Sequence, residues 1–167
     1  GFATCPLSNP TGPISCPPPG MTFTAPKTSS PPSGTTPNAM HLDSSDIELV
    51  SDFEPAAYGV QKVGLRFTGM TKPTGATITG AYLNFRAIAA DPGMTNRDAT
   101  NLTIRGQLSA NPTTFTTTSG NISSRALTTA SASWVPTSWT TGSNYSSPSI
   151  VSVIQELVDQ GGWASGN

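Results

Sequence analysis

Charged side chains are scarce in this sequence. Asp, Glu, Lys and Arg make up 10% of its 167 residues, against about 25% in an average soluble domain. Ser and Thr supply about a quarter of the chain, so hydroxyl groups must wet much of its surface. The formal net charge is -1 and no basic cluster occurs, which argues against nucleic acid as a partner and against binding to an anionic membrane.

Long apolar runs are also missing. None approaches the roughly 20 residues that a membrane helix needs, so we expect no membrane insertion. The length suits one globular core with an appendage. The first residue is Gly1, as expected after removal of a signal peptide, although a cloned fragment would begin in the same way. These features predict a secreted protein, extracellular or at the cell surface.

Cysteine is limited to Cys5 and Cys16, which bracket a segment rich in proline and glycine. In an oxidising compartment the favoured interpretation is a disulfide that closes this loop. The alternative is a metal-binding or redox-active thiol pair. A metal site would need further ligands, and the chain has no second cysteine pair and a single histidine, His41. We therefore predict no metal and no cofactor.

Catalytic residues are few. His41 would have to serve as the base for any nucleophilic serine, but no Gly-x-Ser-x-Gly elbow occurs, and His41 lies in an alternating segment that predicts a surface strand. The one acidic cluster comprises Asp43, Asp46, Glu48, Asp52 and Glu54. Asp46 and Glu48 would share a strand face, which favours a solvated surface over a glycosidase pair. We expect no enzymatic activity.

A polar loop at residues 90–98 offers oxygen ligands. Asp91, Asn96 and Asp98 could contribute to a calcium site. Their spacing does not match an EF-hand, so the sequence favours a polar loop without metal.

Residues 1–37 form a proline-rich segment. Because proline fixes φ and donates no hydrogen bond, we expect an extended, polyproline-like arm that stays out of sheet interiors. Residues 21–24 alternate as a short strand would, and could dock on another surface.

Residues 38–167 show short alternating runs divided by turn residues. Such runs predict half-buried strands, and their number predicts an all-β fold, an antiparallel β-sandwich of jelly-roll type. The runs are Met40–Leu42, Ile47–Leu49, Val63–Phe67, Ile78–Phe85, Leu102–Ile104 and Ala130–Trp134.

One C-terminal segment has helical periodicity. Ser147 and Pro148 predict an N-cap followed by the first helical residue, and Gly161 with Gly162 predicts the stop. The apolar face would consist of Ile150, Val153, Ile154, Leu157 and Val158. We expect one helix of about three turns that covers an end or edge of the sandwich.

Aromatic side chains suggest where a sugar could stack. Trp134 alternates with small residues and is predicted to be core. Trp139, in a loop after Pro136, and Tyr145 are candidates for stacking on sugar rings, although loop tryptophans also plug sandwich ends.

Three sequons predict N-glycosylation in a eukaryotic secretory pathway, at Asn101, Asn121 and Asn144.

Several strings in order resemble a β-sandwich domain found in large bacterial surface proteins and green-algal extracellular proteins. They are Val63–Thr68, Gly75–Phe85, Leu102–Gly106, Asn121–Arg125, Ala130–Trp134, Ile154–Val158 and Gly162–Asn167. The run Leu65–Phe67 with Gly75–Ile78 is also distantly similar to DNRLRE-type carbohydrate-binding jelly rolls. The Pro-Pro-Pro and Ser-Pro-Pro motifs resemble hydroxyproline-rich wall, matrix and appendage glycoproteins, which implies modification at Pro17, Pro18, Pro19, Pro31 and Pro32.

The resemblance also implies that the domain continues past residue 167 into further strands, so residues 38–167 would lack the last strands of the sandwich and leave an open sheet edge. Either a strand or arm of another chain covers this edge, or residues lost by cleavage or not included in the sequence complete it. We therefore expect a structural module of an extracellular matrix, cell wall or surface filament, joined to other copies or to other glycoproteins through the arm and the open edge. The alternative is a carbohydrate-binding module whose partner is a polysaccharide.

Overall fold

The structure is a computed structural model that describes residues 27–29, 38–42, 47, 49, 61–89, 101–136 and 138–166. Within these residues the chain forms short strands and one short helix, which confirms the all-β expectation. The strands are β1 (Lys27–Ser29), β2 (Met40–His41), β3 (Gln61–Val63), β4 (Asn84–Arg86), β5 (Leu102–Ile104), β6 (Ala132–Trp134) and β7 (Asn144–Ser146), and the helix is α1 (Val151–Val158).

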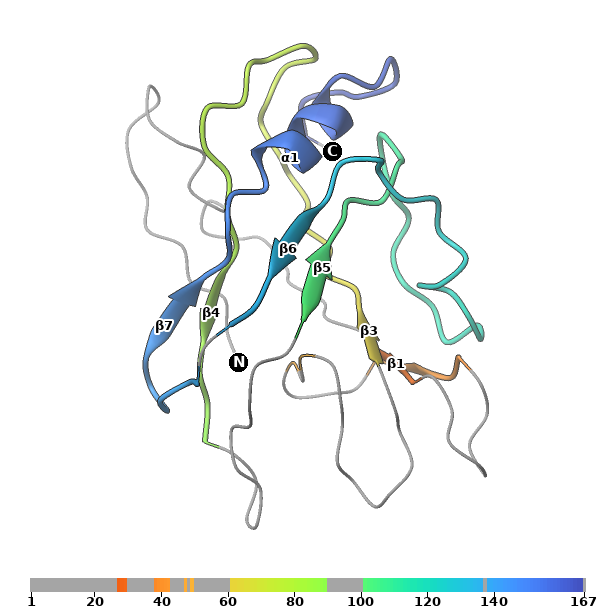
Figure 1. Cartoon of the computed structure of the whole chain (residues 1–167). Helices are drawn as coiled ribbons and strands as arrows, with labels where there is room; N and C mark the ends of the chain where they lie inside the picture. Colours follow the sequence, from red (N-terminus) through yellow and green to blue (C-terminus); the bar gives the residue numbers. More distant parts are fainter. Residues whose placement is uncertain are drawn as a thin grey trace.

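The described strands form three small antiparallel sheets (Figure 1). One has the order β2-β1-β3, and the other two are the ribbons β4–β7 and β5–β6. Because β1 is the central strand of its sheet, Lys27–Ser29 depart from the arm that was predicted to stay out of sheet interiors. Residues 27–30 lie between Pro26 and Pro31 and contain no proline, so their N–H groups are available for a ladder.

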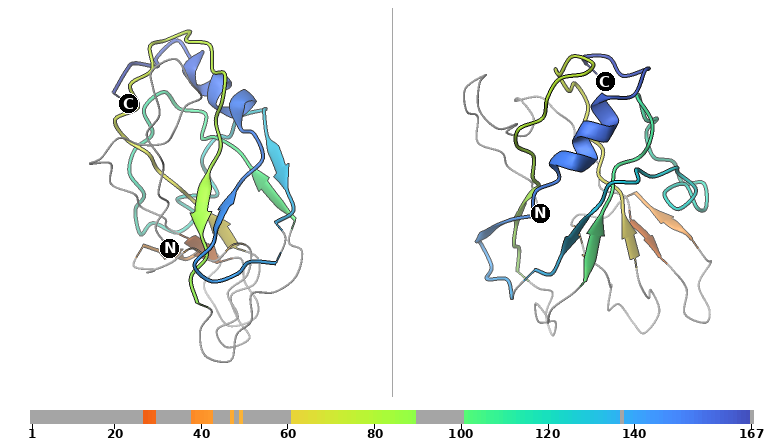
Figure 2. Two further views of the ribbon diagram at one scale, coloured as in Figure 1. Left: turned by 90° about the vertical axis from the view of Figure 1, so that its left-hand side faces the viewer. Right: turned by 45° about the horizontal axis from the view of Figure 1, so that its top comes forward.

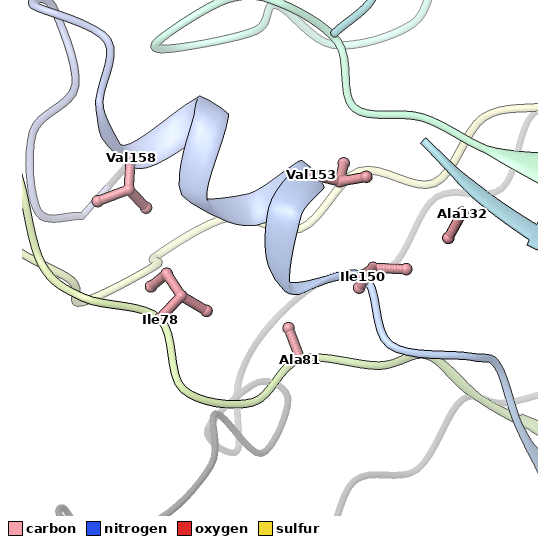
Figure 3. Close-up of a cluster of buried hydrophobic side chains, with 6 residues drawn as sticks. All are labelled: Ile78, Ala81, Ala132, Ile150, Val153 and Val158. Carbon is pink, nitrogen blue, oxygen red and sulfur yellow. The ribbon is translucent and has the colours of Figure 1, made fainter. Parts of the chain in front are cut away.

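Figure 2 shows the position of α1 relative to the two ribbons, and Figure 3 shows the hydrophobic core that joins the helix to both. Val153 and Val158 of the helix are 2% and 1% exposed. They cluster with the segment before β4 and with β6, and the core cluster comprises Ile78, Ala81, Ala132, Ile150, Val153 and Val158. The predicted apolar face of the helix is therefore the face that the protein buries.

The helix starts later than predicted. It spans eight residues with Ile150 as its N-cap, and no side chain caps it. Ser147 does not serve as the cap because its hydroxyl is already engaged in the β4–β7 ribbon. It accepts a hydrogen bond from the Leu83 N–H at 2.9 Å and donates to the Pro148 carbonyl at 2.8 Å. The helix is thus shorter than the three turns expected.

Gly106 allows the helix to pack against the strand that continues from β5. A Cβ at this position would lie 2.9 Å from Leu157 Cδ1 and 3.1 Å from Thr128 Cγ2. Thr128 is fully buried, and its hydroxyl accepts from the Gly106 N–H at 3.0 Å. Side chains larger than hydrogen would have to displace both neighbours.

We therefore expect Gly106→Ala to lower the free energy of unfolding by about 1–3 kcal/mol, the usual cost of overpacking. Gly161→Ala is the matched control, because nothing lies within 4 Å of a Cβ there, and it should change stability by less than about 0.5 kcal/mol. Urea denaturation measures both values. Equal stability of the two variants would contradict the close approach of α1 at Gly106.

Glu156 accepts hydrogen bonds from the backbone of a bulge. This bulge interrupts the pairing between the strands that contain β5 and β6. Ile104 faces Ala132, whereas Gly106 faces Thr128. Arg105 alone therefore stands opposite residues 129–131, and two of these have no ladder partner. The Glu156 carboxylate accepts the N–H groups of Thr129 at 2.9 Å and Ala130 at 2.8 Å. The helix thus supplies the acceptors that the strand cannot.

These bonds make stability depend on pH. The N–H groups of Ala130 and then Thr129 hold the pKa of Glu156 below its ordinary value of 4.5. Burial opposes this shift in part, and the charge of Arg105 adds a smaller lowering effect. A carboxyl whose pKa is lowered by folding contributes stability above its unfolded pKa and loses that contribution as the pH falls through its folded pKa. Glu156 should therefore stabilise the fold at neutral pH.

We expect the melting temperature of the wild type to fall more steeply between about pH 5 and about pH 3 than that of Glu156→Gln. The difference between the melting temperatures of the wild type and Glu156→Gln should become smaller as the pH falls. Ser152→Ala, at an exposed position of the same helix, should keep the wild-type slope. Parallel melting curves for wild type and Glu156→Gln across this range would refute the assigned role of Glu156.

A loop at residues 112–125 is held by one guanidinium. Arg125 stacks over the Phe115 ring at 4.3 Å and donates five hydrogen bonds of 2.7–3.0 Å. The acceptors are the carbonyls of Thr113, Thr114 and Asn121 and the side chains of Gln107 and Asn121. Charge-assisted bonds of this kind fix a loop that has little apolar content of its own.

The C-terminal residues lie beside residues 70–74. The Trp163 indole donates to the Lys72 carbonyl at 2.8 Å, and the Gly166 N–H donates to the Met70 carbonyl at 2.7 Å. Trp163 also packs against the core cluster. The segment after α1 therefore belongs to the same folded body.

Candidate functional site: the β4–β7 ribbon

The hydrogen-bond pattern of the β4–β7 ribbon decides which backbone groups remain outside it. Residues 84–86 pair with residues 146–144. On either side of this pairing, the Ala87 N–H donates to the Ser143 carbonyl at 2.9 Å and the Ser147 N–H donates to the Leu83 carbonyl at 2.8 Å. Because bonded pairs alternate in an antiparallel ladder, Phe85 and Tyr145 form the bonded pair between them.

The same alternation turns the backbone groups of Asn144 and Ser146 away from β4. Among the described residues β7 pairs with β4 alone, and both residues are exposed. Each presents one N–H and one C=O along the outer border of the ribbon, which we call the β7 edge. Such a row of backbone groups is a template for another strand.

The side chains of the ribbon separate into two faces. Ala81, Phe85 and Ala87 are buried on one face. Their neighbours in sequence therefore point to the opposite face, together with the exposed residues of β7. We call this the outer face, and it consists of Tyr82, Asn84, Arg86, Asn144 and Ser146. The Ser146 hydroxyl donates to Asn84 Oδ1 at 2.6 Å across the two strands.

A hollow of about 290 Å³ adjoins the outer face. Tyr82 is the one aromatic residue of its lining, and Gly80 contributes backbone alone. The complete lining is Gly80, Ala81, Tyr82, Ser146, Ser147 and Ser149. Small residues, hydroxyls and one aromatic ring therefore meet at this end of the ribbon.

Trp139 and Tyr145, the residues predicted to stack on sugars, stack on each other. Their ring centroids lie 4.7 Å apart with an interplanar angle of 3°. Trp139 also lies 6.0 Å from the Phe85 ring and 5.9 Å from the Trp134 ring, and is half-buried. The Tyr145 hydroxyl accepts from the Thr140 N–H at 2.7 Å. At least one face of each ring is thus used to close the end of the ribbon.

The three sequons differ in their surroundings. Asn101, before β5, and Asn144, on β7, are exposed. Asn121 is half-buried, and its Oδ1 accepts from the Thr116 N–H at 3.1 Å and from Arg125 at 2.9 Å. Asn101 and Asn144 are therefore the more accessible for a glycan.

Several predicted residues lie outside the described part of the chain. These are Cys5, Cys16, the five arm prolines, the acidic cluster Asp43, Asp46, Glu48, Asp52 and Glu54, and the loop residues Asp91, Asn96 and Asp98. His41 is described, and it lies half-buried in β2. The described residues hold no group of three His, Cys, Asp or Glu side chains suited to a metal ion. They also include no helix long and apolar enough to cross a membrane.

Sequence reasoning did not single out Tyr82, Asn84 or Arg86. They fall within a run that was predicted as a strand, where alternate polar side chains indicate only a solvated face. Their signal is the combination of an aromatic ring, an amide and a guanidinium at alternate positions. It becomes visible once β7 is known to lie beside them.

Comparison of the chain with protein-family models, with curated proteins and with solved structures finds no match in any of the three.

Proposed function

We propose that this chain is a secreted, non-enzymatic structural module of an extracellular glycoprotein assembly such as a matrix, a cell wall or a surface filament. In this proposal its sheets are parts of a β-sandwich of jelly-roll type. Copies of the chain join by pairing their β7 edges, and the proline-rich arm makes further contacts with neighbours. The observation that carries the proposal is the β7 edge with its outward backbone groups.

The β7 edge is complementary to itself. If two copies of β7 lie antiparallel with Tyr145 opposite Tyr145, Asn144 of one copy faces Ser146 of the other, and the reverse pair forms by symmetry. These are the residues whose N–H and C=O groups point outward, so all of them find partners in a two-fold contact. The result would be a continuous sheet with the order β4-β7-β7-β4.

A contact of this kind is small. A pairing of three residues per copy lies well below the roughly 1,200–2,000 Å² that stable complexes bury. We expect weak pairwise association that becomes strong when many modules are linked, because linked sites bind at a high effective concentration. Contacts made by the arm would add to the same effect.

Analytical ultracentrifugation of the full chain from about 1 µM to about 1 mM tests the proposal. We expect a monomer at low concentration and a dimer or larger species at high concentration. A folded monomer over the whole range, with or without the arm, would contradict assembly through copies of this chain.

We propose carbohydrate binding as a second function. The observation that favours it is the hollow of the β4–β7 ribbon, whose lining combines Tyr82 with three serines and Gly80. Sugar rings stack their C–H faces on aromatic rings and bond to hydroxyls and amides. Trp139 and Tyr145 would support this site by closing the opposite end of the ribbon.

A further inference from the structure

We infer that the outer face of the β4–β7 ribbon binds a saccharide that carries carboxylate groups, with one ring in the hollow at Tyr82 and a carboxylate at Arg86. The inference rests on the second proposed function and specifies its ligand. It uses a different surface from the β7 edge, because strand side chains stand roughly perpendicular to the sheet.

The spacing of the outer face suits an extended ligand. Alternate residues of a strand lie about 7 Å apart on one face, so Tyr82 and Arg86 are separated by about 13 Å along the ribbon. Asn84 and Ser146 lie between them and bond to each other at 2.6 Å. This bond uses Asn84 Oδ1, and the amide nitrogen of the same side chain is a hydrogen-bond donor. One ligand could therefore contact the ring, the amide and the guanidinium in sequence.

The hollow fixes the size of the group at one end. Its volume of about 290 Å³ falls at the lower limit of the roughly 300–1,000 Å³ of small-molecule pockets. Its lining includes one aromatic residue, Tyr82, and two small residues, Gly80 and Ala81. Ser146 and Ser149 are also among its lining residues. A single sugar ring matches this combination better than an extended apolar group does.

Arg86 determines the charge of the ligand. It is exposed, and within the described chain its guanidinium has no hydrogen bond or ion pair. Among the described residues of the outer face it is the one charged side chain. A guanidinium presents paired donors that match a carboxylate in a bidentate contact. A polyuronate therefore fits the face better than a neutral polymer.

The test is calorimetric titration of the full chain, produced without N-glycosylation, with oligogalacturonate and with its methyl ester. We expect oligogalacturonate to bind at least about tenfold more tightly than the ester, with an affinity that falls as salt rises. Arg86→Gln should remove this preference and leave the affinity for the ester unchanged. Tyr82→Ala should weaken the binding of both ligands.

Arg105→Gln is the charge control, because it removes the same charge from an exposed arginine outside the β4–β7 ribbon. It should leave both affinities unchanged. If Arg86→Gln has no effect while Tyr82→Ala abolishes binding, the carboxylate inference fails and sugar binding at the hollow stands. If Arg86→Gln and Arg105→Gln lose equal affinity for oligogalacturonate, the attraction is a diffuse effect of charge and the assignment of the site to Arg86 fails. Failure of the wild type to bind either ligand overturns the inference, and a screen of neutral sugars then decides the second proposed function.

Discussion

Trp134→Ala should lower the free energy of unfolding by about 3–5 kcal/mol. Trp134 is 9% exposed and its ring lies 5.4 Å from that of Phe85 and 5.9 Å from that of Trp139. It therefore connects β6 to the aromatic cluster of the β4–β7 ribbon. Removing the indole would leave a cavity that its neighbours can fill only in part. Urea denaturation followed by far-ultraviolet circular dichroism measures the loss.

The matched control is the next residue. Val135 is 54% exposed, so Val135→Ala should cost less than about 0.5 kcal/mol. A loss below about 1 kcal/mol for Trp134→Ala would mean that β6 and the ribbon do not share a packed cluster.

Asn144→Pro should reduce the self-association constant of the chain at least about tenfold. Proline removes the outward N–H of residue 144 from each copy, and a two-fold contact loses both bonds at about 1 kcal/mol each. The fold should survive because that N–H does not pair with β4, and proline is tolerated where a strand's N–H faces solvent. Sedimentation analysis with a thermal melt of the same sample measures both effects.

Asn144→Ala keeps the backbone donor and removes the same sequon, so it separates edge pairing from any effect of the side chain. It should associate as the wild type does. Were the alanine and proline variants to associate equally, the β7 edge would not be the contact between copies.

Parts of this fold could be predicted from local sequence pattern. Leu102–Ile104 and Ala132–Trp134 were expected as strands because apolar and polar residues alternate in them, and each forms one strand of the β5–β6 ribbon. The buried face of the helix was likewise predicted from its periodicity, and Val153 and Val158 are its most buried residues. In these cases burial of one face decides the local structure.

Other parts depend on contacts between distant residues, and no local pattern reveals them. Asn144–Ser146 becomes a strand because β4 lies beside it, although Asn-Tyr-Ser has no apolar alternation. Ser147 resembles a helix cap in sequence, but the ladder with Leu83 claims its hydroxyl. The bulge opposite Arg105 likewise depends on two distant contacts. One is the register between the strands that contain β5 and β6, and the other is the pair of hydrogen bonds that the Glu156 carboxylate accepts.

The candidate site could not be predicted from local sequence either, because it depends on which residues lie beside one another in the ribbon. Tyr82 and Arg86 occupy polar positions of a predicted strand, where the simplest expectation is a solvated face. Trp139 and Tyr145 attracted attention as aromatic residues near turn signals, yet their mutual stacking follows from how residues 139–145 fold back toward β4. Sequence identifies the chemical groups, whereas the pairing of β4 with β7 determines which of them face outward.

Residue-resolved hydrogen exchange along β7, recorded below and above the concentration at which the chain associates, addresses assembly most directly. Pairing between copies predicts that the amides of Asn144 and Ser146 exchange freely in the monomer and become protected on association, while that of Tyr145 is protected in both. Unchanged exchange at Asn144 and Ser146 in the associated state would show that copies meet elsewhere, and would contradict the account.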